Sequence, residues 1–323
     1  MSSVFVQRII YGIVLVLAVI ILNFMLIQAA PGDVVDVIVT EAGGGNPVIV
    51  DQIRTAYGLD KPIYVQLFKY LVKMLTGDLG YSYYYDKSVL SLLLSHLPST
   101  LMLALAALII AVFIGTLLGV VAALHPQGIS SHLVTVFSLL GYATPVFWLG
   151  MMILLLFSLY IPLFPAFGIR SIPVPETALA RTLDVIHHLI LPIFTLSILF
   201  LASYSRVGRA SMLDVLGSDY IRTARAKGLS EIVVIFKHAL KNAALPIVTL
   251  AGLQLGYIFS GAVLVETVFS LPGVGPLLYE SIMRRDYPVM LGVLFGAAVT
   301  TIIANILTDL SYRLLDPRIR GIS

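Results

Sequence analysis

The sequence predicts an all-α membrane protein with six transmembrane helices. Of its 323 residues, 59% are hydrophobic and only 11% are charged, whereas ordinary soluble domains carry about 25% charged residues. A soluble chain of this length cannot bury so much apolar surface. The apolar runs are continuous and do not alternate, which favours helices over the strands of a membrane barrel. The composition therefore excludes a soluble globule and a disordered chain.

Six apolar segments are long enough to cross a bilayer, which takes about 20 residues. The predicted spans are Ile9–Ala30, Leu101–Leu124, His132–Tyr160, Leu189–Ser205, Pro246–Val265 and Val289–Leu310. Pro145 interrupts the third span, and the fourth span is the shortest. The first span is longer than the apolar core of a cleaved signal peptide, so we expect it to remain as a membrane helix.

The placement of Lys and Arg predicts that both termini are cytoplasmic. With this orientation, the basic residues of the short loops lie mostly inside, above all between Arg206 and Lys241. The net charge of +3 is then a property of membrane topology, and we expect no nucleic-acid partner. Because the chain has no cysteine, a disulfide framework and a thiol nucleophile are excluded. The expected location is the cell (inner) membrane, in multi-pass form.

The long segment Pro31–Leu97, between the first two spans, is predicted to be structured outside the cytoplasm. Within it, residues Pro62–Leu75 have the apolar spacing of an amphipathic surface helix. One face of this helix carries Ile63, Leu67, Tyr70 and Leu71. Two interpretations remain open for this helix: packing on the membrane part, or docking of an outside partner.

The loop between the fourth and fifth spans has the pattern of a helix, a break, a short helix, a glycine and another helix. Ser218 or Asp219 offers an N-cap for a short helix over Tyr220–Lys227. Gly228 supplies a left-handed stop, and Ser230 caps the helix that follows. That helix is predicted to run to Pro246, because proline fits a helix start better than a helix interior.

The residues of this loop resemble the EAA loop of ABC importer permeases. The matching runs are Tyr220–Glu231 and His238–Pro246, and they are most similar to those of the dipeptide/oligopeptide/nickel permease family. Further motifs of that family follow in the same order at Tyr57–Pro62, Gly77–Ser82, Thr144–Gly150, Glu266–Gly275 and Leu315–Arg318. The resemblance covers nearly the whole chain, and its long outer segment indicates the B-type permease subunit.

The resemblance implies a type I ABC importer permease fold with a structured extracytoplasmic segment between helices 1 and 2. The implied division is residues 1–98, a permease domain over 99–312 with its coupling loop at about 206–245, and a cytoplasmic tail over 313–323. The sequence departs from the general EAA pattern, since Arg222, Thr223 and Ala224 stand where many importers have Glu-Ala-Ala. The role of that glutamate therefore does not transfer to this chain.

The implied function is that of a permease subunit, which is not an enzyme and has no catalytic residues. The implied partners are a second homologous permease, one or two ATP-binding subunits, an extracytoplasmic substrate-binding protein and membrane lipid. No cofactor or metal is expected on this chain, and ATP and Mg would be used by the partner subunits. Dipeptides or oligopeptides are the expected substrates, with nickel and sugars left open by the family's range.

The chain has no phosphate-binding loop of its own, so an ATPase partner must act on a rigid cytoplasmic element. We predict that this coupling element comprises Arg222, Thr223, Ala224, Arg225, Ala226, Lys227, Gly228, Leu229, Ser230 and Glu231. Small side chains there allow close approach, and glycine allows a sharp turn. The alternative is a solvated basic loop that contacts lipid headgroups.

Polar residues and glycine pairs inside the spans are further candidates. Polar side chains in lipid usually face protein or water; the candidates for a translocation path are Gln254, Thr301, Asn305 and Asp309, with interhelical hydrogen bonding as the alternative. Small residues four positions apart allow close helix packing or a moving interface; these are Gly115, Gly119, Gly252, Gly256, Gly292 and Gly296, and the last pair continues to Thr308. The doublet His187–His188 is not expected to bind metal, because adjacent side chains on a helix diverge.

Two other classes of protein are alternatives to the permease subunit. A self-contained secondary transporter of a small polar solute would carry inverted repeats and paired charges at mid-membrane. An intramembrane enzyme would carry a nucleophile and a base, or metal ligands, at membrane depth. The sequence shows neither pattern.

Overall fold

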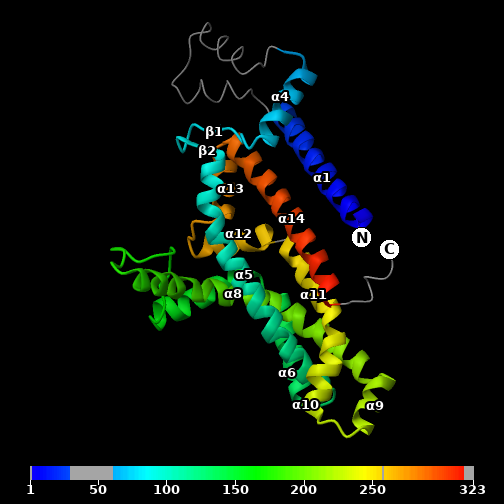
Figure 1. The fold of residues 1–323 in the computed structure, drawn as a ribbon. Coiled ribbons are helices and arrows are strands. Elements are labelled where there is room, and N and C mark those ends of the chain that lie inside the picture. Colours follow the sequence, from blue (N-terminus) through cyan, green and yellow to red (C-terminus); the bar gives the residue numbers. More distant parts are fainter. Residues whose placement is uncertain (1, 30–60, 257, 316–323) are drawn as a thin grey trace. The chain divides into compact units, whose positions relative to one another are not determined.

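The computed structural model describes the backbone of residues 2–29, 61–256 and 258–315. Side chains are described for residues 10–26, 28–29, 61–256 and 262–308. Most of the described residues are helical (Figure 1). The chain divides into two compact units, one made of residues 1–97 with 277–302 and the other of residues 98–276 with 303–323.

The first unit combines the N-terminal part of the sequence with residues 277–302. Its elements are α1 (Ser2–Ala29), α4 (Ile63–Leu75), β1 (Tyr81–Ser82), β2 (Lys87–Ser88), the start of α5 (Val89–Leu124), the end of α13 (Val274–Met283) and the first half of α14 (Tyr287–Leu315). The two strands form an antiparallel hairpin with Tyr81 opposite Ser88. The buried Asn23 amide on α1 donates to the carbonyl of Leu291, at 3.2 Å. The buried Ser82 hydroxyl donates to Asp286, which also accepts the Val289 N–H and so caps α14.

The second unit is built around α8. Its elements are the rest of α5, α6 (Ile129–Ala143), α7 (Val146–Leu154), η1 (Leu155–Tyr160), α8 (Ala178–Leu216), α9 (Asp219–Ala226), α10 (Glu231–Val233), η2 (Val234–Ala239), α11 (Leu240–Gly256), α12 (Ile258–Val268) and the end of α14. Helices α6, α7, α11 and α12 all contact α8. The cores on α8 are apolar, with Leu196 and Phe269 fully buried in one cluster and Leu108 and Tyr204 in a second.

The described residues hold four helices long and apolar enough to cross a membrane, or up to five if the bent pair α6 and α7 with η1 counts as one. The four are Val89–Leu124, Ala178–Leu216, Glu231–Gly256 and Tyr287–Thr308. A shorter apolar helix lies within α1, over Ile10–Leu26. An integral membrane protein is thus confirmed.

The third predicted span is broken at Pro145, as the sequence indicates. The two helices on either side of the break meet at 102°. Thr144 is extended, with φ −83° and ψ 126°. Proline disfavours helical conformation in the residue before it and has no N–H to continue the ladder, so the bend is a local consequence of this residue.

The helices at the predicted fourth and fifth spans begin earlier in the chain than those spans do. Helix α8 covers Ala178–Leu216, 39 residues, more than twice the length of Leu189–Ser205, because hydropathy marks only its apolar middle. The candidate membrane helix at the predicted fifth span begins at Glu231, well before Pro246; its described part ends at Gly256, and α12 covers Ile258–Val268. Pro246 therefore lies inside α11; membrane helices accept proline because neighbouring groups satisfy the freed carbonyl.

Candidate coupling site and membrane interior

Helix α9 packs one face into an apolar cluster of the second unit, called here the seat of α9. Its side chains Ile221 and Ala224 are 0% and 7% exposed. They belong to a cluster that includes Val120 of α5, Met212 of α8 and Val234 of η2. The spacing of three residues puts both side chains on one helix face. The inner face of α9 thus belongs to one apolar cluster with residues of α5, α8, η2 and α11.

The turn after α9 has the conformation that the sequence predicts. Gly228 has φ +77°, and its N–H donates to the carbonyl of Arg225 at 2.9 Å. Ser218 and Ser230 occupy the N-cap positions of α9 and α10, as predicted. Neither side chain, however, accepts a hydrogen bond from the first turn of its helix. The Ser218 hydroxyl instead donates backwards to the carbonyl of Val215, at 2.6 Å.

Two side-chain contacts hold α9 to the segment that follows it. The Arg225 guanidinium reaches both carboxylate oxygens of Glu231, at 2.8 and 3.3 Å, across the Gly228 turn. The Asn242 amide of α11 donates to the Tyr220 hydroxyl at 2.8 Å. Sequence reasoning missed both pairs, although all four residues lie in the two runs that carry the family resemblance.

Nine of the ten residues predicted for coupling are exposed, and the tenth, Ala224, is buried in the seat of α9. The small side chain of Ala224 therefore allows α9 to pack closely on the other helices of this chain. Ala226 lies on the opposite face of α9, which is exposed to solvent. That face is basic, since it carries Arg222, Arg225 and Lys227. Arg222 lies 3.7 Å from Asp219, and both side chains are largely in solvent.

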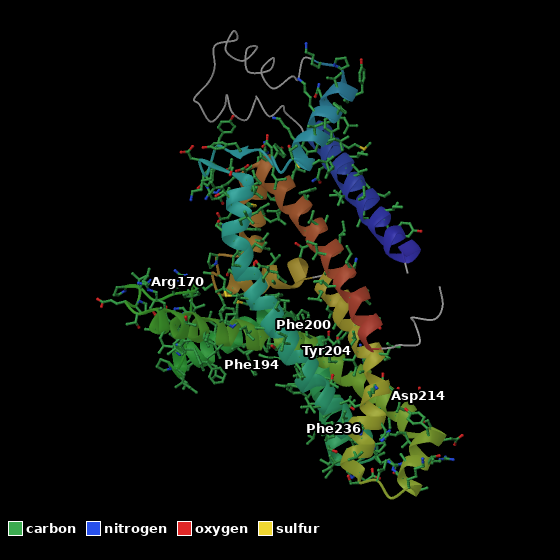
Figure 2. All side chains as sticks on the ribbon, in the orientation of Figure 1. Arg170, Phe194, Phe200, Tyr204, Asp214 and Phe236 are labelled. Carbon is green, nitrogen blue, oxygen red and sulfur yellow. The ribbon has the colours of Figure 1, made fainter. Side chains whose placement is uncertain are left out.

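Four of the six glycines in these pairs lie at close helix contacts. On α5, a Cβ at Gly115 would lie 2.6 Å from the Cβ of Tyr204, which Figure 2 labels on α8, and a Cβ at Gly119 would lie 2.7 Å from the backbone of α8. On α11, a Cβ at Gly252 would overlap the Thr308 side chain of α14. On α14, a Cβ at Gly292 would overlap the side chain of Val89. A Cβ at Gly296 would make an ordinary contact with Leu93, at 3.7 Å. Gly256 is the last residue of α11.

The four candidates for a translocation path have different environments. Gln254 is half-buried on α11, and its Oε1 has no hydrogen-bond partner among the described residues. The Thr301 hydroxyl donates to Ala297 of its own helix at 2.9 Å. Asn305 is exposed on the same helix, α14. The side chain of Asp309 lies outside the described residues.

Sequence reasoning missed a buried carboxylate in the second unit. Glu266 of α12 is fully buried and accepts hydrogen bonds from the Thr100 hydroxyl at 2.6 Å and the Gly275 N–H at 2.9 Å. A side chain at Gly273 would overlap this carboxylate. The Pro272–Pro276 turn is glycine-rich because the carboxylate occupies the space beside it, which only the family motif Glu266–Gly275 could have indicated.

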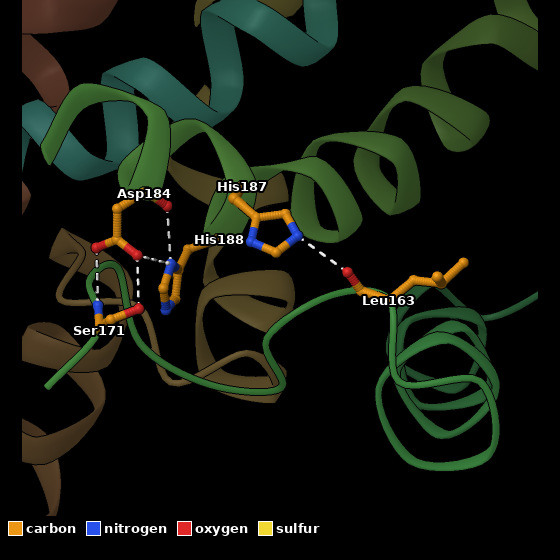
Figure 3. A network of polar contacts seen from close by, with 5 residues as sticks. All are labelled: Leu163, Ser171, Asp184, His187 and His188. Carbon is orange, nitrogen blue, oxygen red and sulfur yellow. Dashed lines mark hydrogen bonds and ion pairs between the residues drawn. The ribbon is translucent and has the colours of Figure 1, made fainter. Parts of the chain in front are cut away.

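Figure 3 shows a polar network at the start of α8. Asp184 accepts the N–H and the hydroxyl of Ser171, at 2.8 and 2.6 Å, and lies 3.4 Å from His188. His187 points away and contacts the Leu163 carbonyl at 2.9 Å. The described residues contain no group of three His, Asp or Glu side chains that could hold a metal. The network instead ties the loop before α8 to the helix.

A cavity of about 770 Å³ lies between α5 and α8. Its walls are mainly aliphatic and include Phe194, while Arg170 and Arg181 stand among its lining residues (Figure 2). Arg181 donates to the carbonyls of Pro175 and Glu176, at 2.8 and 3.0 Å. The second unit thus has an apolar hollow beside two cationic side chains.

The chain belongs to the family described as binding-protein-dependent transport system inner membrane component, whose profile matches residues 115–321. A second profile, for the N-terminal part of such membrane components, matches residues 1–104. The protein is therefore a permease subunit and a multi-pass protein of the inner membrane. This confirms the family resemblance, and a self-contained secondary transporter is not favoured.

Relatives match nearly the whole chain. The oligopeptide transport system permease protein AppB of Bacillus subtilis is 37% identical over 99% of both chains. The di/tripeptide permease DppB of Pseudomonas aeruginosa and the dipeptide permease DppB of Escherichia coli are 40% and 39% identical, each over 93% of both chains. A chain of the inward-facing MetNI methionine ABC transporter matches with a TM-score of 0.55 at 17% identity, covering 70% of this chain and 96% of that one. This last likeness shows the fold alone.

Proposed function

We propose that this permease imports dipeptides or oligopeptides, using ATP hydrolysed by separate subunits. The relatives named above are peptide permeases, and the family description names a transport system that depends on a binding protein. The partners in this proposal are a second homologous permease, one or two ATP-binding subunits and an extracytoplasmic binding protein. This chain itself hydrolyses nothing and binds no cofactor, and ATP and Mg act in the partner subunits.

The observation that carries the proposal is the two-faced geometry of α9. Its inner face is locked through Ile221 and Ala224 to α5, α8 and η2, and its outer face exposes Arg222 and Arg225. An ATPase that binds the outer face can move three helices of the permease together. Two arrangements of these helices would open the pathway to one side and then the other.

The proposed topology has six spans with both termini in the cytoplasm. Helix α1 supplies the first span, and the bent pair of α6 with α7 supplies the third. Gln254, Thr301, Asn305 and Asp309 would line the pathway near its inner end. Because the chain contains no cysteine, single cysteines at Arg222 and Thr76 report topology directly: a membrane-impermeant thiol reagent should label position 76 from outside and position 222 only in inverted vesicles.

Arg222→Glu tests the coupling role. The substitution reverses one exposed charge, and its ion pair with Asp219 contributes little to stability in solvent. We expect ATP-driven dipeptide uptake in proteoliposomes to fall at least tenfold and the ATPases to be lost on co-purification, with thermal unfolding unchanged. Lys87→Glu, an equal charge reversal on the hairpin, is the matched control.

Gly228→Asp is the second coupling variant: no atom lies within 4 Å of the added Cβ, so its cost to folding is the backbone strain at φ +77°, which thermal unfolding measures separately. If both coupling variants keep normal uptake and normal co-purification, α9 is not the coupling element. Competition of a labelled dipeptide by a pentapeptide, by Ni²⁺ and by a disaccharide then separates the substrate classes. Peptide import is contradicted if only the metal or the sugar competes.

A further inference from the structure

Helix α4 has three distinct faces. Leu67, Tyr70, Leu71 and Met74 lie on the face that is buried or half-buried. A second face is apolar and exposed; its residues are Tyr64, Phe68, Val72 and Leu75, at 70%, 67%, 45% and 62% exposure. A third face carries Lys69 and Lys73 in solvent. One apolar face is thus covered by other parts of the protein. A second apolar face of equal length is exposed; it is called here the open face.

The contacts of α4 place it at one end of α1. Phe24 of α1 packs against Tyr70, with ring centroids 5.9 Å apart, and the Gln28 amide donates to Gln66 at 3.0 Å. Gln28 is the next-to-last residue of α1. Since the proposed topology makes α1 a membrane span, its C-terminal end marks the outer boundary of the hydrocarbon, and α4 lies at that boundary.

The charges of α4 favour a lipid surface over a protein as the occupant of the open face. The helix contains two lysines and no acidic residue; Asp78, which follows the helix, lies 3.9 Å from Lys73. Lysine is depleted in protein interfaces, whereas lysines beside an apolar stripe with Phe are typical of helices that lie in the headgroup region. Anionic headgroups complement these charges.

We infer that α4 is an interfacial helix that inserts its Tyr64–Phe68–Val72–Leu75 stripe into the outer leaflet and binds anionic phospholipid headgroups through Lys69 and Lys73. The inference rests on the proposed topology for the choice of leaflet. Its consequence is that the outer end of α1 is held by lipid as well as by protein.

The natural absence of cysteine allows a clean test of depth. Phe68→Cys and Lys73→Cys chains, each labelled with an environment-sensitive fluorophore, are reconstituted in phosphatidylcholine vesicles with 30 mol% phosphatidylglycerol. Nitroxides on the lipid acyl chains should quench the label at position 68 at least twofold more than the label at position 73. Equal quenching overturns the inference. So does a label at position 68 that stays in water until the binding protein is added, because the occupant is then a protein.

The lysines are tested by headgroup selectivity. With the label at position 68, quenching by nitroxide phosphatidylglycerol is compared with quenching by nitroxide phosphatidylcholine at equal mole fraction and low salt. The preference for the anionic lipid should fall about fivefold for each lysine removed in Lys69→Gln and Lys73→Gln. Lys87→Gln, on the hairpin, should leave it unchanged. A preference that survives both α4 substitutions contradicts the headgroup site.

These measurements use the purified permease without ATPase or substrate. Normal ATP-driven uptake combined with a water-exposed position 68 therefore rejects the interfacial helix alone. Inserted labels combined with a failure of ATP-driven peptide uptake reject the proposed transport function alone.

Discussion

The hydroxyl of Thr100 and the carboxylate of Glu266 lie 2.6 Å apart in the protein interior, although 166 positions separate them in the chain. Thr100 also accepts the Val274 N–H at 2.9 Å, and the second carboxylate oxygen of Glu266 accepts the Gly275 N–H. One hydroxyl and one carboxylate thus satisfy the first two N–H groups of α13. Together they hold α5, α12 and the start of α13 at a single point.

Thr100→Val should lower the free energy of unfolding by about 1–3 kcal/mol, because the buried Val274 N–H then has no acceptor in Thr100 and Glu266 loses a donor. Valine has nearly the same shape, so the change removes hydrogen bonds and leaves packing intact. Thermal unfolding in detergent measures the effect. Thr267→Val, which removes an exposed hydroxyl that bonds only within its own helix, should have little effect. If both variants change the free energy of unfolding equally, the hydrogen bonds of Thr100 contribute no more to stability than the local hydrogen bond of Thr267.

Gly252→Ala should destabilise the protein by about 1–3 kcal/mol through overpacking against Thr308. Thr308 cannot turn aside easily, since it is β-branched and its hydroxyl bonds to Ala304 at 2.8 Å. Adding Thr308→Ala should recover most of the loss. Thermal unfolding of the two single variants and the double variant gives the coupling energy. Gly296→Ala, whose Cβ has room, is the control, and additive effects at 252 and 308 would show that the two residues do not meet.

Gly228→Ala should cost about 1 kcal/mol of unfolding free energy, because an L-residue is strained at φ +77°. The surrounding space is open, so backbone strain is the whole cost, and Gly228→Asn should cost less, since asparagine accepts left-handed conformation. Gly217→Ala serves as the control: Gly217 has φ −79°, which alanine adopts freely. A ranking in which asparagine is worse than alanine would contradict this account.

Tyr85 should make the free energy of unfolding fall as the pH rises above 10. Burial, together with its 2.8 Å hydrogen bond to Glu280, raises the pKa of Tyr85 above its ordinary value near 10. A pKa raised by folding contributes stability that is full below pH 10 and is lost as pH rises toward the folded value. The difference in melting temperature between the wild-type protein and Tyr85→Phe should therefore be larger at pH 8 than at pH 11.

Tyr279→Phe, on the exposed side of α13, controls for the loss of one hydroxyl, and its melting temperature should follow that of the wild-type protein at both pH values. A constant difference between wild type and Tyr85→Phe across this range would exclude ionisation of Tyr85 as the cause.

Local chemistry made parts of the fold predictable. Gly228 could be placed because a left-handed stop after a short helix is a property of one residue. The break at Pro145 could be placed because proline disfavours helical conformation in the residue before it, although Pro246 of α11 shows that a helix of this protein can also contain a proline. The family was recognisable because its motifs are contiguous runs, such as Tyr220–Glu231.

Features that depend on distant partners were not predictable. The Thr100–Glu266 pair joins residues of two predicted spans, and no periodicity within either span indicates the other. The extent of α8 was missed because Arg181 and Asp184 interrupt the hydropathy but not the helix. Ser218 failed as a cap because its hydroxyl has a competing acceptor, the Val215 carbonyl, three residues earlier.

The length of α8 has a mechanical consequence. At about 1.5 Å per residue, its 39 residues extend roughly 58 Å, nearly twice the thickness of a bilayer core. One end carries the Asp184 network, and the other ends a few residues before α9. Over such a length a small rotation becomes a large displacement: tilting a straight helix of roughly 58 Å by about 5° moves its far end by about 5 Å. A small rotation of α8 about its α9 end would thus become a large displacement at the Asp184 network.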